Sequence, residues 1–368
     1  MTRSVVARQI LQRSLVLVLV FVAGVAVTSG LATSPPSAST PPPTRVLAVS
    51  SNPRVTPASV PPDYVGAIDL TLQAGARGSF LSWTWKALEP SPGVFKLDEV
   101  KEGLPNLGNT RGLDLLVGLQ VINTTAKEVP SDLSATPFDA DVMTTRFHAF
   151  VDALRPHLNR HVKYLSIGNE VDIYLTTHSQ EWDAYKRFYR DGLAYVHAVA
   201  PWVKVGVTVT YDGAVGQKGQ VADLNSRSDI FILTYYPLGP RFIPRGPDAP
   251  MTDIPKMTAL ASRWPVVLQE VGYPSATVLS SSELNQAKFV SGVFRAWNAS
   301  AARIPFLNYF LLHDFPPHLC ENLAQYYGPP TIETSKLSLC SLGLRYSDGN
   351  PESAWSALVK AAKAAGFH

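Results

Sequence analysis

The chain has 368 residues, of which 46% are hydrophobic and 17% are charged, as in folded globular proteins with a large core. Three of its 32 basic residues are the arginines at positions 3, 8 and 13, so 29 basic residues remain beyond them to balance 29 acidic ones. A net charge near zero gives no electrostatic footprint for nucleic acid or an anionic surface, and we expect neither as a partner.

Residues 1–32 predict an export signal. The three arginines precede an apolar run from Leu15 to Val27, and Gly30-Leu31-Ala32 offers small residues for cleavage. The run is shorter than the roughly 20 residues of a spanning helix. We therefore expect a secreted or cell-envelope protein, with an uncleaved membrane anchor as the alternative and membrane contact only in that case.

Residues 33–44 are rich in Ser, Thr and Pro and predict an extended linker. The folded part of the chain is then expected to begin at residue 45 and to continue to residue 368. We expect it to be a monomer.

Within residues 45–368, apolar runs of strand length alternate with helical patterns. The predicted strands are Arg45–Val49, Ser79–Trp83, Leu113–Gln120, Val162–Ile167, Val203–Thr208, Ile230–Tyr235, Val266–Gln269 and Ile304–Leu311. The predicted helices are Tyr64–Ala74, Leu97–Leu107, Ala140–Leu158, Gln180–Ala200, Gly219–Asn225, Thr252–Arg263, Ser282–Ala299 and Pro351–Ala365. Eight strands in strict alternation with eight helices predict an α/β fold, a single-domain (β/α)₈ TIM barrel.

Two glutamates stand where predicted strands end. Glu170 follows the fourth strand and Glu270 follows the seventh, so the two can face each other across the barrel mouth, where such barrels build their active sites. Hydrolysis of a glycosidic bond requires two carboxyl groups in one cleft. The competing interpretation is two unrelated surface glutamates.

With Asn169 before Glu170, this pattern resembles clan A of the retaining glycoside hydrolases, whose barrels carry an Asn-Glu pair at the end of strand four and a Glu at the end of strand seven. The resemblance implies that Glu170 is the general acid/base, Glu270 the nucleophile and Asn169 a ligand of the sugar 2-hydroxyl. It also implies that no metal or organic cofactor is needed.

Aromatic residues complete the predicted site. Tyr235 or Tyr236, at the end of strand six, is expected to donate a hydrogen bond to the nucleophile, unless it is a core residue. Trp83 and Trp85 lie in a segment similar to one that follows an early strand in many clan A enzymes, and indole rings suit sugar faces. At least one of the two is also compatible with a place in the core. Glu89 in the same segment is expected to fix the loop.

The chain departs from the clan after strand eight, where a Trp is usual and His313 follows instead, as a candidate to orient a ligand. The only two cysteines, Cys320 and Cys340, are candidates for a disulfide because export permits one. Two buried thiols are the alternative. Loops at Leu238–Met251 and Pro316–Leu342 are expected to shape the cleft.

These observations predict an exported retaining glycoside hydrolase that cleaves a β-glycosidic bond in a poly- or oligosaccharide. The alternative from another functional class is a non-catalytic carbohydrate-binding barrel at the cell envelope. The sequence does not decide the sugar or the linkage, because one barrel hosts many specificities in its loops.

Overall fold

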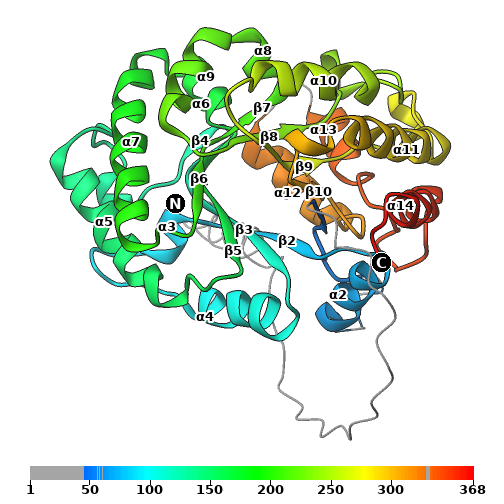
Figure 1. Cartoon of the computed structure of the whole chain (residues 1–368), viewed down its shortest axis with the longest axis horizontal. Helices are drawn as coiled ribbons and strands as arrows, with labels where there is room; N and C mark the ends of the chain where they lie inside the picture. Colours follow the sequence, from blue (N-terminus) through cyan, green and yellow to red (C-terminus); the bar gives the residue numbers. More distant parts are fainter. Residues whose placement is uncertain (1–44, 56, 58, 60, 329–331) are drawn as a thin grey trace, which may run out of the picture.

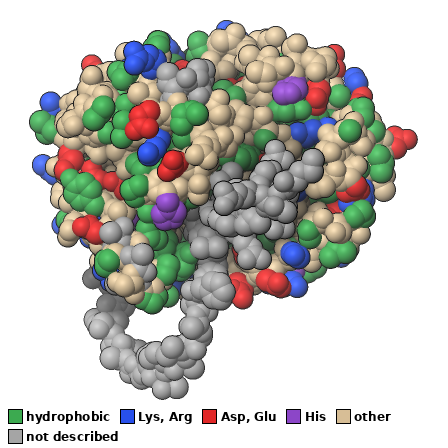
Figure 2. Space-filling view, turned by 180° about the vertical axis from the view of Figure 1, so that it is seen from behind, with side chains coloured by type: hydrophobic (Ala, Val, Ile, Leu, Met, Phe, Trp, Pro, Cys, Tyr) green, Lys and Arg blue, Asp and Glu red, His purple; other side chains and the backbone are tan. Residues whose placement is uncertain are grey.

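The protein is represented by a computed structural model that describes residues 45–368 apart from 56, 58, 60 and 329–331. The predicted export signal and linker lie outside the described residues. Among the helices of the described part, none combines the length and apolar character needed to span a membrane. Basic and acidic side chains are interspersed over the described part of the face in Figure 2, in keeping with the balanced charge of the chain.

The described residues form a closed parallel barrel (Figure 1). Its strands are β1 (Val46–Val49), β2 (Gly78–Thr84), β3 (Asp114–Asn123), β5 (Val162–Asn169), β6 (Lys204–Gly206), β7 (Thr208–Thr210), β8 (Phe231–Tyr235), β9 (Val266–Val271) and β10 (Phe306–Tyr309). The ring closes because β6 pairs with β5 and β7 pairs with β8, so these two short strands act as halves of one barrel strand. The predicted eight-strand barrel is confirmed, with its fifth strand interrupted at Val207. A short β4 (Ala126–Lys127) pairs antiparallel with β3.

Helices surround the ring. The predicted eight correspond to α2 (Tyr64–Gln73), α4 (Asp98–Leu104), α5 (Asp141–Leu154), α7 (Trp182–Val199), α9 (Lys218–Leu224), α10 (Pro250–Leu260), α11 (Glu283–Ala299) and α14 (Ser353–Ala364). Short helices follow several strands at the mouth: α3 (Trp85–Leu88), α6 (Val171–Thr177), α8 (Tyr211–Gly216), α12 (Pro317–Tyr327) and α13 (Ile332–Leu339).

Three helices, α4, α5 and α10, end three or more residues earlier than predicted, and proline accounts for the first two. The α-helical part of α5 ends at Leu154, and a 3₁₀ turn, Arg155–His157, carries Pro156. The α-helical part of α4 ends at Leu104, and a π-helical turn begins at Pro105. Proline lacks the backbone N–H that would continue the α-helical ladder, so both α-helical parts are shorter than hydrophobic periodicity predicts. After α4 the π-helical turn continues to Thr110.

Alternation of side chains along the strands divides the barrel interior into two layers. The lower layer is apolar and is formed by Ala48, Phe80, Leu116, Tyr164, Ile230, Ile232, Val267 and Phe306. Two positions further along several strands the inward residues are polar: Ser50, Ser82, Ser166, Thr234, Gln269 and Asn308. The floor of the barrel mouth is therefore hydrogen-bonding, whereas the base is a packed apolar core.

Two buried carboxyls, those of Asp314 and Glu352, lie near one another, with Glu352 at the N-terminus of α14. Asp314 and Glu352 are 8% and 2% exposed, and Asp314 Oδ1 accepts a hydrogen bond of 2.7 Å from the Gly343 N–H. Burial, and then the charge of Glu352, raise the pKa of Asp314 to about 9, against the opposing effect of that hydrogen bond. Burial also raises the pKa of Glu352 to about 7. The folded protein therefore holds protons here that the unfolded chain releases near pH 4.

Because the folded state binds more protons than the unfolded state between about pH 4 and pH 9, this pair makes the free energy of unfolding fall as the pH rises through that window. We expect Asp314→Asn, which cannot ionise, to flatten that fall between pH 6 and pH 9. Denaturant unfolding at several pH values measures the slope. Asp141→Asn, an exposed position on α5, is the control and should leave the slope unchanged. Equal slopes in all three proteins would contradict the assignment.

Candidate active site

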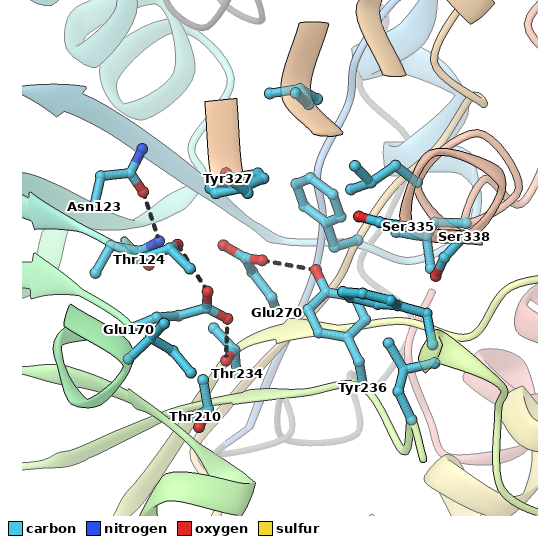
Figure 3. Close-up of a pocket in the computed structure, with 18 of the residues that line it drawn as sticks. Asn123, Thr124, Glu170, Thr210, Thr234, Tyr236, Glu270, Tyr327, Ser335 and Ser338 are labelled. Atoms are coloured by element: carbon cyan, nitrogen blue, oxygen red, sulfur yellow. Dashed lines mark hydrogen bonds between the residues drawn. The ribbon is translucent and has the colours of Figure 1, made fainter. Parts of the chain in front are cut away.

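The carboxyl ends of the barrel strands open into a cavity of about 660 Å³. Its floor includes Ser50, Ser82 and Thr234 of the polar inward layer, and its outer side is formed by the loop after β8 and by α12 and α13. Glu170 and Glu270 both line it, one from the end of β5 and one from β9 (Figure 3). The predicted loops at Leu238–Met251 and Pro316–Leu342 do contribute to the cavity, partly as helices.

Glu170 is held by two threonines. Its Oε2 accepts a hydrogen bond from Thr124 Oγ1 at 2.8 Å, and its Oε1 accepts one from Thr234 Oγ1 at 2.7 Å. The residue lies in the left-handed region, with φ 47° and ψ 43°, directly after β5 and at the N-terminus of α6. A non-glycine residue held there carries backbone strain, which proteins retain mainly at functional sites. Burial raises the pKa of Glu170, and the Thr234 and Thr124 hydroxyls oppose this shift.

Glu270 is aimed into the cavity by a β-bulge. Leu233 pairs with Leu268 but Thr234 pairs with Glu270, and the register with β10 shifts at the same point. The additional residue in β9 lets both Gln269 and Glu270 lie at the site, whereas strict alternation would turn one of them away.

Glu270 has a phenol and an amide as hydrogen-bond donors. Tyr236 Oη donates to its Oε2 at 2.7 Å, and Gln269 Nε2 donates to its Oε1 at 3.3 Å. Burial, and then the negative charge of Glu170, raise the pKa of Glu270 to about 7, while both donors favour the ionised form. Because each carboxylate disfavours a charge on the other, the arrangement suits a pair that shares one proton near neutral pH.

Asn169 belongs to the hydrogen-bonded floor. Its Nδ2 donates to Asn123 Oδ1 at 3.1 Å, and its Oδ1 accepts from Gln269 Nε2 at 2.7 Å. Gln269 Oε1 in turn accepts from Thr208 Oγ1 at 2.7 Å. Asn169 also lines the cavity. Because of these hydrogen bonds, its amide is already oriented before a ligand binds.

The two tyrosines after Leu233 have different surroundings. Tyr236 contacts Glu270, whereas Tyr235 is fully buried and donates a 2.8 Å hydrogen bond to Asp253 outside the cavity. Of the two predicted donors, Tyr236 is therefore the one that bonds Glu270, and Tyr235 is the core residue that the alternative described. Strand alternation carries the signal, because Thr234 faces inward, Tyr235 outward and Tyr236 inward again.

Neither Trp83 nor Trp85 lies in the cavity. Trp83 points outward from β2 and donates its indole N–H to Glu99 at 3.1 Å. Trp85 stacks with Phe150 and Phe188 and meets Phe147 edge to face in the layer between strands and helices. Their prediction as sugar-binding residues is wrong, because the chain turns into α3 at Trp85 and the odd-numbered positions of β2 face the helices.

Glu89 fixes the loop after β2, as predicted. It is fully buried and accepts hydrogen bonds from the Trp85 indole at 2.8 Å, the Gly93 N–H at 2.8 Å and the Arg146 guanidinium at 2.6 Å.

His313 also lies outside the cavity. It is 2% exposed, and its backbone N–H donates to Asn52 Oδ1 at 3.0 Å. Its ring Nδ1 lies 2.7 Å from the backbone carbonyl oxygen of Asn52. The prediction that it orients a ligand is wrong, because the chain after β10 turns back onto the segment following β1 before it reaches His313. Phe310 and Phe315 from the same connection line the cavity instead.

Asp172 has a strongly perturbed pKa but a structural place. Burial raises its pKa to about 7, and it is fully buried outside the cavity lining. Its carboxylate accepts from the Thr210 N–H at 2.8 Å and from Thr210 Oγ1 at 2.6 Å. These bonds fix the start of α6 against the end of β7.

Sequence reasoning missed several residues beside the glutamates. Thr124 and Thr234 hold Glu170, and Tyr327 of α12 lies over the carboxylates in Figure 3. Burial, and then the charges of Glu170 and Glu270, raise the pKa of Tyr327. Alternation along β8 could have identified Thr234. The segment Pro316–Leu342 is expected to shape the cleft, but no local pattern indicates that Tyr327 is its residue beside the carboxylates.

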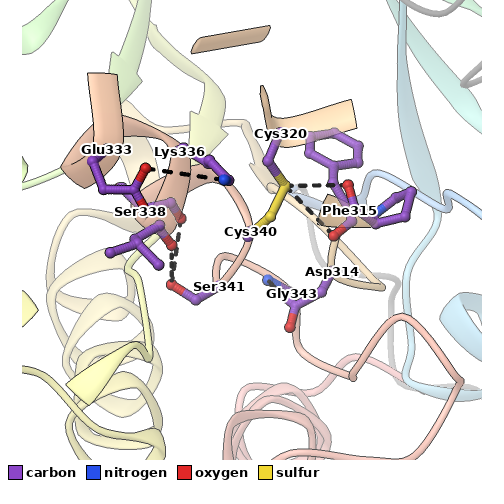
Figure 4. Close-up of a disulfide and its surroundings, with 11 residues drawn as sticks. Asp314, Phe315, Cys320, Glu333, Lys336, Ser338, Cys340, Ser341 and Gly343 are labelled. Carbon is purple, nitrogen blue, oxygen red and sulfur yellow. Dashed lines mark hydrogen bonds and ion pairs between the residues drawn. A yellow bond between two sulfur atoms is a disulfide. The ribbon is translucent and has the colours of Figure 1, made fainter. Parts of the chain in front are cut away.

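The Cys320–Cys340 disulfide joins α12 to the residue after α13, with 5.6 Å between the Cα atoms (Figure 4). Leu323, Tyr327, Ser335 and Ser338, which lie between the two cysteines, line the cavity. The bridge therefore constrains part of the cavity wall. Within the described residues no group of three or more His, Cys, Asp or Glu side chains is placed to hold a metal ion.

No protein-family model matches the chain, and no curated protein matches it. Solved structures do. A GH5_18 protein from Bifidobacterium longum subsp. longum superposes with a TM-score of 0.64 at 17% identity, over 87% of this chain and 79% of that one. The chain has the (β/α)₈ fold of these glycoside hydrolases.

Two further likenesses support the same fold. The exo-beta-1,4-mannosidase Op5Man5 from Opitutaceae bacterium strain TAV5 gives a TM-score of 0.67 at 18% identity, over 87% of this chain and 59% of that one. A family 39 glycoside hydrolase from Bacteroides cellulosilyticus WH2 gives a TM-score of 0.61 at 15% identity, over 87% of this chain and 64% of that one.

The Tyr236 hydroxyl stabilises the ionised form of Glu270, so Tyr236→Phe should raise the pKa of that carboxyl. A hydrogen bond to a charged group contributes about 1.5–3 kcal/mol, which corresponds to a rise of about one to two pH units. NMR titration of ¹³C-labelled glutamate measures it. Tyr235→Phe is the matched control, since that hydroxyl bonds Asp253, and it should leave the Glu270 titration in place. Equal titrations in all three proteins would refute the contribution of Tyr236.

Removing the disulfide should destabilise the cavity wall. In the loop-entropy description, a bridge over 20 residues of sequence separation contributes about 3 kcal/mol to the free energy of unfolding. We expect Cys320→Ser with Cys340→Ser to lose roughly that amount and to become more susceptible to proteolysis between the two positions. Denaturant unfolding and mapping of the first cleavage sites measure both, and a variant matching the wild type in both would contradict this role.

Proposed function

We propose that the protein is an exported retaining glycoside hydrolase that cleaves a β-glycosidic bond. The observation that carries the proposal is the pairing of Glu170 and Glu270 in one cavity, each with its own hydrogen-bond donors and each with a raised pKa. Two carboxyl groups flanking one bond are the requirement of glycoside hydrolysis. The fold shared with known glycoside hydrolases is consistent with this chemistry.

The environments of the two carboxyls support different roles. Tyr236 and Gln269 both donate to Glu270, which favours its carboxylate as the nucleophile at the anomeric carbon. Glu170 is buried near that charge and holds the proton that the leaving oxygen needs. After departure of the leaving group, Glu170 as carboxylate takes a proton from water, which attacks the anomeric carbon and releases Glu270.

Neighbouring groups fit the same assignment. Asn169, oriented by Asn123 and Gln269, is proposed to bind the sugar hydroxyl next to the reacting carbon. A GH5_18 structure from Streptomyces cattleya contains GlcNAc, with a TM-score of 0.64 at 17% identity over 81% of this chain and 73% of that one. This likeness supports a pyranoside as the ligand class.

An open cavity lined by both glutamates favours catalysis over the alternative of a binding barrel, because a pure binder has no use for an acid and a nucleophile. We propose that the predicted N-terminal signal exports the enzyme and that it acts as a monomer.

Substrates with different leaving groups distinguish the acid/base role of Glu170 from the nucleophile role of Glu270. Glu270→Gln should lose hydrolysis of every aryl β-glycoside, by about 10⁴-fold or more. Glu170→Gln should slow hydrolysis of glycosides with poor leaving groups, such as methylphenols, by about 10²–10⁴-fold. It should still form the glycosyl-enzyme from dinitrophenyl glycosides, because dinitrophenolate leaves without a proton. Initial rates and the burst phase on both aglycones measure this difference.

Glu102→Gln, on the exposed surface of α4, is the control and should match the wild type. NMR of the first-formed sugar anomer should show retention. A folded wild type that hydrolyses no glycoside but is retarded on glycan gels would instead support the binding barrel.

A further inference from the structure

The cavity has two chemically distinct sides. Its floor is polar, from Gln120, Asn123, Asn169 and the two glutamates. Its outer side is mainly apolar, although Arg241, Ser335 and Ser338 also line it. The apolar residues are Leu238 and Phe242 after β8, Phe310 and Phe315 after β10, and Leu323 and Leu339 from α12 and α13. We call these six residues the apolar wall.

Four of the six residues of the apolar wall are packed against one another or against a buried cluster. Phe310 and Phe315 meet edge to face at 5.9 Å between ring centroids, and Phe310 meets Tyr236 in the same way at 6.4 Å. Phe315 and Leu323 are buried in one cluster with Leu311, Cys320 and Leu342, and Leu339 packs against this cluster. The disulfide crosses it. The shape of this part of the wall is therefore set before a ligand binds.

A glycan chain suits this wall poorly. Each further sugar ring would turn hydroxyl groups toward apolar carbon, and a hydroxyl that loses water without gaining a partner is destabilising. Extended sugar sites also use broad indole faces, yet all seven tryptophans lie among the described residues and none lines the cavity. A ligand carbon surface would instead gain from burial there.

We propose that the substrate is a β-glycoside with one sugar on the polar floor and a large apolar aglycone, alkyl or aromatic, against the apolar wall. This inference rests on the proposed function and replaces the poly- or oligosaccharide that the sequence suggested. A cavity of about 660 Å³ lies within the usual range of small-molecule sites, about 300–1,000 Å³, and holds one sugar with such a group.

Binding of thioglycosides tests the wall without requiring turnover. Methyl, butyl and octyl thio-β-D-glucosides and thio-β-D-mannosides are titrated calorimetrically below their micelle concentrations. Affinity should rise with chain length, by up to about fourfold for each methylene that is fully buried, and by at least about 100-fold from methyl to octyl.

Variants locate the effect. Phe242→Ala and Leu339→Asn should each weaken octyl binding by about tenfold and methyl binding far less. Val278→Asn, at a 72% exposed position that does not line the cavity, is the control and should change neither. Circular dichroism and thermal unfolding confirm that each variant is folded.

Octyl and methyl compounds of equal affinity, with tighter binding of a tetrasaccharide of the same sugar, would overturn the inference. Hydrolysis of the matching octyl O-glycosides separates it from the proposed function. Chain-length-dependent binding without hydrolysis would refute the enzyme but keep the apolar wall. Hydrolysis of oligosaccharides in preference to octyl glycosides would keep the enzyme and refute the wall.

Discussion

The hydrogen-bonded floor of the barrel mouth is the constraint on which the site depends, and Gln269 is its centre. Its amide accepts from Thr208 and donates to Asn169 and Glu270, so residues of three barrel strands are tied together. Gln269 is 1% exposed, and a buried amide without partners would cost about 1–3 kcal/mol. The geometry that satisfies this amide also sets where both glutamates lie.

That geometry has an electrostatic consequence. Two carboxyl groups in one recessed cavity cannot both ionise readily, so one proton is retained between them near neutral pH. The partners around each group then determine where the proton resides. Tyr236 and Gln269 favour charge on Glu270, while Glu170, strained at the start of α6, has two threonine hydroxyls that can act as donor or acceptor.

The rest of the cavity is built by elements outside the regular barrel. α12 and α13 fold back over the mouth after β10, and the disulfide joins them. Together with Phe242 they give the cavity a mainly apolar surface, whereas a polysaccharide site is expected to be a polar, open groove. The fold shared with other glycoside hydrolases does not indicate the substrate, because a barrel accommodates many substrates through its loops.

The sequence by itself determined the barrel, from eight apolar strands in alternation, and the positions of Glu170 and Glu270 at strand ends, since both follow from local periodicity. Alternation along β8 also predicts that Thr234 and Tyr236 face inward, and therefore that Tyr236 rather than Tyr235 contacts Glu270. Only the tertiary structure decided that a bulge turns Glu270 inward and that Trp83, Trp85 and His313 lie outside the cavity. It also decided that α12 carries Tyr327 to the carboxylates. These features depend on pairing register and on packing between segments far apart in sequence, which no local pattern records.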